Sequence, residues 1–247
     1  MHWPPNYNEA GKIKNITRVI FLDYDNLAYS LYLMKPDQVV SQTLEWMTFM
    51  FFPFIFAMFG IYLATYERKF RTIKIRAVQT GWKTNLLSKQ LSMYISSTLI
   101  VSISLLTSYI IGMVLYQFVV QDIPASEFKL EAIPESHNIF LQYFLSLFIC
   151  FIFSTLGFYL GTILKGYMAP TLIFVVYNFI IPILGKFDIR NMLALLGHKV
   201  FDFKGRVQLF IPTEMSLSLV FISLFLLVVL STVITYYVSE KQTKYVI

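Results

Sequence analysis

Five long stretches of the chain contain no Asp, Glu, Lys, Arg or His. They cover residues 46–66, 90–121, 138–164, 166–185 and 215–239. Each has the roughly 20 residues that an α-helix needs to cross about 30 Å of hydrocarbon. The bilayer core offers no water to the backbone, and the chain lacks the short alternating strands of a barrel. The pattern therefore predicts an all-α, polytopic transmembrane helix bundle with five visible spans.

The composition agrees with a membrane protein and gives no sign of catalysis. The chain is 57% hydrophobic and only 14% charged, well away from an average soluble domain. A single cysteine, Cys150, argues against a disulfide framework or a zinc site. The HExxH, GxSxG and GxxxxGKS/T motifs are absent from the sequence. We therefore expect no enzyme activity in this chain, with no catalytic residue, metal site or cofactor of its own.

The connector between the first two stretches is strongly basic. From Thr65 to Gln90 it carries seven Lys or Arg side chains and one acid. Five spans would leave ten basic residues on each side of the membrane, but the density in this short loop favours a cytoplasmic location. Residues 1–45 are then extracellular or interfacial. Because a basic tail would have to cross with no span ahead of it, we hypothesise a sixth span upstream in the native protein.

The connector also has the spacing of an amphipathic helix. Ile75, Val78, Trp82 and Leu86 follow one another at intervals of 3, 4 and 4 residues, which places them on one helical face. One interpretation is a basic loop that lies on anionic lipid. The other is a docking helix whose apolar face enters a groove on a soluble partner while its charges steer the encounter.

The five stretches lack the ionisable groups that ion-coupled transporters commonly use inside the membrane. If this chain moves a molecule uphill, a partner must supply the work. The sequence around the connector bears on which partner that is.

The order of features resembles the ABC-2 type permeases, the membrane subunits of ATP-binding-cassette exporters. Glu67 directly follows the first stretch, Thr72 and Thr80-Gly81 lie in the basic segment, and Lys89 directly precedes the second stretch. The likeness continues with the turn KGYM at 165–168 and the external segment 186–211, and covers roughly residues 44–240. Arg71 stands where the family often has Gly, and the family's usual first span is not found.

The resemblance implies an ABC-2 type transmembrane domain over residues 46–240, with a coupling segment at 67–89 and an external re-entrant segment at 186–211. A separate ABC ATPase subunit would bind ATP and Mg and drive export, and a second permease copy or paralogue would complete a dimer. The other expected partners are membrane lipids, and no nucleic acid is expected to bind. The expected location is the bacterial plasma membrane. The expected cargo is an amphipathic or antimicrobial peptide or a lipid-like molecule. Together with the apolar face, the coupling candidates are Glu67, Arg68, Thr72, Ile75, Val78, Thr80, Gly81, Trp82, Leu86 and Lys89.

Small residues at four-residue spacing predict close helix contacts. Gly157 and Gly161 form a GxxxG pair, and Ser108 and Gly112 continue a similar repeat. Packing within the chain and a dimer seam both remain open. Two other functions also stay open: a non-transporting membrane anchor or scaffold for a soluble partner, and a sensory subunit that acts through its outer segments.

Overall fold

The computed structural model describes residue 24, residues 26–69, 81–122 and 138–201, residue 203 and residues 209–244. Every regular element within these residues is a helix, which confirms the predicted all-α bundle. The chain divides into two compact units. One comprises residues 1–42 and 105–136, and the other comprises residues 43–104 and 137–247.

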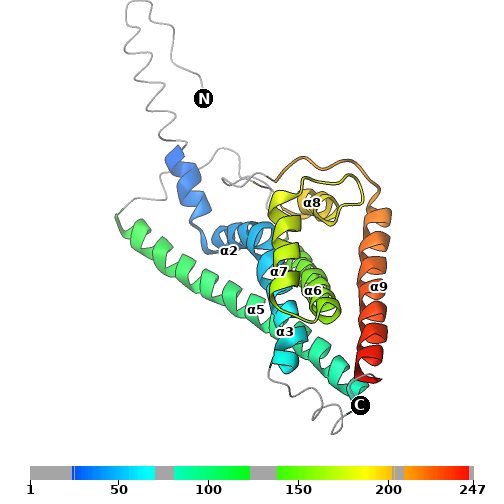
Figure 1. Ribbon diagram of the computed structural model, residues 1–247. Coiled ribbons are helices and arrows are strands. Elements are labelled where there is room, and N and C mark those ends of the chain that lie inside the picture. Colours follow the sequence, from blue (N-terminus) through cyan, green and yellow to red (C-terminus); the bar gives the residue numbers. More distant parts are fainter. Residues whose placement is uncertain are drawn as a thin grey trace, which may run out of the picture. The chain divides into compact units, whose positions relative to one another are not determined.

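Four helices are long and apolar enough to cross a bilayer, which is the character of a membrane protein. The first is continuous through α2 (Pro36–Trp46), the π-helix η1 (Met47–Phe51) and α3 (Phe52–Lys69). The other three are α5 (Trp82–Asp122), α6 (Ile139–Leu164) and α9 (Leu217–Lys244) (Figure 1).

The fourth predicted span is shorter than expected. Residues 166–185 form the helix α7 (Met168–Val175) and the π-helix η2 (Val176–Ile180), which together rise about 20 Å, short of about 30 Å of hydrocarbon. The helix ends at Ile180, and the backbone of the next residue, Ile181, is extended at φ −72° and ψ 127°. Pro182 explains this ending, because the residue before a proline is disfavoured in the helical region.

The first membrane helix is longer than the charge-free stretch that predicted it. The helix begins at Pro36, ten residues before Trp46, so it includes Glu45. The side chain of Glu45 is buried, with 4% of the residue exposed. Together with Glu67 near its other end, which is 1% exposed, the helix therefore holds two buried acids, whereas the stretch that predicted it contains none.

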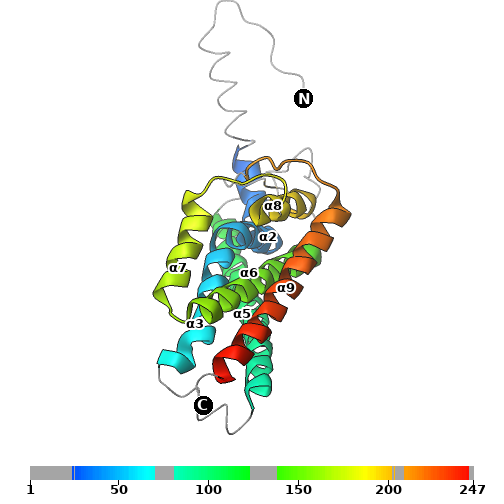
Figure 2. The same ribbon diagram turned by 45° about the vertical axis from the view of Figure 1, so that its right-hand side comes forward.

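The helix α6 is the centre of the larger unit. It contacts η1, α3, α7, α9 and the short helix α8 (Ile189–Val200). Several of these contacts are polar: Thr48 bonds to Ser146 at 2.6 Å, and Tyr94 of α5 bonds to Thr155 at 2.8 Å. Figures 1 and 2 both show α8 lying crosswise at the end of the bundle where α9 begins.

The segment 186–211, predicted to be external and re-entrant, forms the short helix α8 within its described residues. Asp188 caps the start of α8 by accepting a bond from the backbone N–H of Arg190. Among the described residues after α8, Phe201, Phe203 and residues 209–211 are not helical. One face of α8 is buried, through residues that include Met192, Leu193 and Leu196.

The crossing of α3 and α6 explains the glycine pair. A Cβ added at Gly157 would collide with the backbone carbonyl of Ala57, and one at Gly161 would lie 2.9 Å from the Cβ of Ala64. From the other side, a Cβ at Gly60 would collide with the carbonyl oxygen of Ser154. The two backbones can approach this closely only because these positions have no side chain.

The smaller unit contains a second close approach. A Cβ added at Gly112 of α5 would lie 3.2 Å from the Cβ of Val39, so the described part of this unit packs α5 against the start of α2. Ser108, one turn earlier in α5, is half-buried. The three glycines singled out from the sequence, Gly112, Gly157 and Gly161, thus contact helices of the same chain.

Candidate functional site

A buried polar cluster joins the two helices that flank the basic connector. The carboxylate of Glu67, at the end of α3, is 2.9 Å from the ammonium of Lys89 in α5. Asn85 donates its side-chain amide to both carboxylate oxygens, at 3.0 and 3.3 Å. Glu67 is only 1% exposed, so its charge depends on these partners. We call Glu67, Asn85 and Lys89 the connector clamp.

Glycine is required where the connector enters α5. Gly81 precedes the helix with φ of +72°, a left-handed conformation that residues with a side chain rarely adopt. Its carbonyl accepts the backbone N–H of Asn85 and so starts the first helical turn. This turn places Asn85 and Lys89 on the side of α5 that faces Glu67.

The predicted apolar face of the connector turns inward at its described end. Leu86 is 7% exposed and packs in a core with Ala64, Met93 and Phe158. The ring of Trp82 lies 4.8 Å from the ring of Tyr236 in α9. These two side chains pack α5 against the bundle, Leu86 as a buried residue and Trp82 as a half-buried one.

The middle of the connector lies outside the described residues. This applies to Thr72, Ile75, Val78 and Thr80, and for Arg68 the structure describes the backbone alone. Of the ten coupling candidates, the structure brings Glu67 and Lys89 into direct contact, and Gly81, Trp82 and Leu86 lie close to them in sequence.

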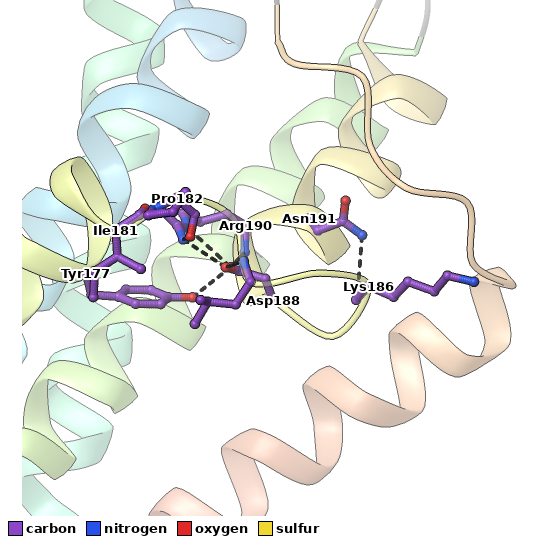
Figure 3. Close-up of polar contacts among 8 residues, drawn as sticks. Tyr177, Ile181, Pro182, Lys186, Asp188, Arg190 and Asn191 are labelled. Carbon is purple, nitrogen blue, oxygen red and sulfur yellow. Dashed lines mark hydrogen bonds and ion pairs between the residues drawn. The ribbon is translucent and has the colours of Figure 1, made fainter.

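A second polar cluster was not predicted from the sequence. The carboxylate of Asp188 accepts hydrogen bonds from the hydroxyl of Tyr177 at 2.8 Å and from the guanidinium of Arg190, whose closest approach is 2.8 Å (Figure 3). Arg190 also donates to the carbonyls of Ile181 and Pro182, at 2.7 and 2.9 Å. We call Tyr177, Asp188 and Arg190 the outer latch.

The outer latch satisfies backbone groups that the end of a helix leaves open. The carbonyl of Ile181 lies just beyond η2, and the guanidinium of Arg190 supplies its donor. The Asp188 side chain also accepts the backbone N–H of Leu184 at 2.9 Å. The latch therefore fixes the turn between η2 and α8. The sequence signal for it is an Asp directly before a helix with an Arg two residues later.

The electrostatics of the latch keep Asp188 ionised. Burial by itself raises the pKa of this carboxyl, but the hydrogen bonds from Arg190, from two backbone N–H groups and from Tyr177 outweigh it and hold the pKa well below its usual range. The same pairing with Asp188 raises the pKa of Arg190. The carboxylate of Asp188 and the guanidinium of Arg190 therefore remain an ion pair at any pH near neutrality.

Comparison with protein-family models, with curated proteins and with solved structures finds no match to this chain. Within the described residues, no three His, Cys, Asp or Glu side chains gather closely enough to hold a metal ion. The resemblance to ABC-2 permeases and the expectation that the chain is not an enzyme and needs no cofactor of its own remain predictions. The connector clamp is the candidate site that bears most directly on them.

Proposed function

We propose that this chain is the transmembrane permease subunit of an ABC exporter, driven by a separate ATPase subunit that docks on the basic connector. The observation that carries the proposal is the connector clamp. The two ends of the connector are held together by a buried ion pair and a bidentate amide contact. A force applied to the connector is therefore delivered to α3 and α5 together.

The third helix in this arrangement is α9. Trp82 contacts Tyr236, and the ammonium of Lys83 lies 5.7 Å from the centroids of both rings. Movement of the first turn of α5 would displace the end of α9 as well. Such a link between a cytoplasmic segment and three membrane helices supports a role in coupling ATP hydrolysis to movement of an export path.

The remaining parts of the proposal follow from the resemblance and the composition. The location is the bacterial plasma membrane, the assembly includes a second permease copy or paralogue, and the cargo is an amphipathic or antimicrobial peptide or a lipid-like molecule. An aromatic-rich bundle with few charges suits such a cargo better than a small ion.

Copurification with nucleotide turnover tests the proposal. The tagged chain is solubilised in mild detergent, and the ATPase rate of the retained partner is measured. The connector variant is Arg71→Gln/Lys74→Gln/Arg76→Gln, and its matched control is Lys186→Gln/Lys199→Gln/Lys204→Gln, which removes three charges on the opposite predicted side. We expect wild type and control to retain an ATPase and the connector variant to lose it, because docking depends on the connector's charges.

Lys89→Met separates docking from coupling. It keeps the other six basic side chains of the connector but breaks the clamp, so we expect the ATPase to be retained while its rate no longer responds to the permease. An ATPase rate that is unaffected by the permease in every variant would instead indicate an anchor. If no nucleotide-binding protein is retained by wild type, the exporter proposal is refuted.

A further inference from the structure

An apolar groove runs between α6 and α7 on the larger unit. It is lined by Leu156 and Leu160 of α6, Leu172 of α7, Tyr177 of η2 and Ile189 of α8, among others, and its volume is about 480 Å³. That volume falls in the range of roughly 300 to 1,000 Å³ that is usual for sites of small molecules.

The chemistry of the lining is uniform. None of the described residues that line the groove is charged, and two tyrosines are its only polar side chains. One of them, Tyr177, donates a hydrogen bond from its hydroxyl to Asp188, so this hydroxyl is already paired within the outer latch. A ligand in this groove therefore meets hydrocarbon and ring faces, which complement an uncharged apolar chain.

The groove is continuous with the apolar outer surface of α7 and η2. Leu172 is 65% exposed and Ile173 is 48% exposed, and both line the groove. Beyond them, Phe179 and Ile180 are 58% and 70% exposed. In a membrane protein such a surface faces lipid tails, so the groove opens into the hydrocarbon of the bilayer.

We propose that this groove holds one acyl chain of a membrane lipid. The acyl chain enters beside α7, because a helix of about 20 Å leaves part of the hydrocarbon thickness unfilled. Inside the groove the acyl chain packs against Leu156 and Leu160. It rests on the ring of Tyr177, whose hydroxyl holds Asp188. The bound lipid thereby supports the outer latch. This inference does not depend on the exporter proposal.

Photolabelling of the full chain tests the lipid site. The protein is placed in nanodiscs of phosphatidylcholine in which a fraction of the lipid carries a diazirine halfway along one acyl chain. After irradiation, mass spectrometry compares the label on residues 156–160 with the label on the lipid-facing residues 225–230 of α9. We expect clear labelling at Leu156 and Leu160, because a chain within the groove reaches them.

Two variants and a control make the result decisive. Leu160→Trp fills the groove and should lower the ratio of groove label to α9 label several-fold, whereas Leu160→Ala should raise it. Leu226→Trp, at a position on α9 that is 55% exposed, should leave labelling at the groove unchanged.

A groove label that neither Leu160 variant alters, or a label confined to the outward faces of Leu172 and Ile173, overturns the proposal. A groove that takes label from a diazirine-bearing amphipathic peptide and none from the phospholipid overturns the lipid assignment as well, and assigns the groove to cargo. If Leu160→Trp fails to give monodisperse protein, the Leu160→Ala comparison still decides the matter.

Discussion

In the most apolar 18-residue segment of α6, 56% is buried inside the protein, whereas in the corresponding segment of α9 only 17% is buried. The two helices have similar lengths, 26 and 28 residues, and the most apolar 18-residue segment of α9 is more apolar than that of α6. Apolar content therefore does not decide which helix lies at the centre. Lipid tails are as apolar as leucine, so helices associate in a membrane through close packing and hydrogen bonds instead.

Small and polar residues account for the difference. Gly157 and Gly161 let α6 approach α3, and Ser146 and Thr155 bond to neighbouring helices. The helix α9 buries only a narrow stripe, which includes Val220, Leu224, Ser231 and Thr235 at helical spacing. The central helix is the one with small or polar residues on several faces.

The largest effect is expected at the crossing of α3 and α6. Gly157→Leu places a side chain where even a Cβ meets the backbone of Ala57, so the two helices must separate. We expect this variant to yield no monodisperse protein in size-exclusion chromatography. Val233→Phe in α9, at a position 58% exposed, adds bulk towards lipid and should elute as wild type. A well-folded Gly157→Leu protein would disprove the tight crossing.

The next largest effect is expected at the connector clamp. Lys89→Ala leaves the buried carboxylate of Glu67 without its ammonium partner, which costs about 3 to 5 kcal/mol. The exchange Glu67→Lys/Lys89→Glu should recover part of this loss, since the opposite charges remain adjacent. Thermal unfolding in detergent measures both, and equal midpoints for the single and the double variant would exclude a direct interaction.

The outer latch should show a smaller effect with a characteristic pH dependence. Asp188→Asn removes charge-assisted hydrogen bonds worth about 1.5 to 3 kcal/mol. Because folding lowers the pKa of Asp188, its contribution is complete above the unfolded pKa of about 3.9 and is lost only as pH falls through the lower folded value.

The difference in unfolding free energy between wild type and Asp188→Asn should therefore stay constant from about pH 8 to pH 5 and shrink below about pH 4. Denaturation at fixed detergent and salt measures it. A difference that already falls between pH 7 and pH 5 would contradict the ion pair.

The smallest effect is expected on the lipid-facing side of α9. Phe225 is 69% exposed, so Phe225→Leu should change the free energy of unfolding by no more than about 0.5 kcal/mol. The same substitution at Phe153 of α6, which is 1% exposed, should cost about 1 kcal/mol or more. Equal effects at the two positions would remove the distinction between the central and the peripheral helix.

The sequence by itself determined the class of the fold. Runs of about 20 residues without charge predict membrane helices because an unpaired peptide group or a charge is costly in hydrocarbon, and this depends on local composition alone. The four-residue spacing of small residues identified Gly157, Gly161 and Gly112 as contact points. The resemblance to ABC-2 permeases singled out Glu67 and Lys89, although as candidates for coupling to an ATPase subunit.

Only the tertiary structure decided which groups meet. The burial of Glu45 depends on how the chain folds back on itself. The same holds for the contact between Glu67 and Lys89 and for the contacts of the outer latch. Hydrophobic periodicity placed Trp82 and Leu86 on one face, but that face packs against α9 and the core as readily as against a partner. Composition fixes which segments enter a membrane, whereas their neighbours depend on long-range packing that no local pattern encodes.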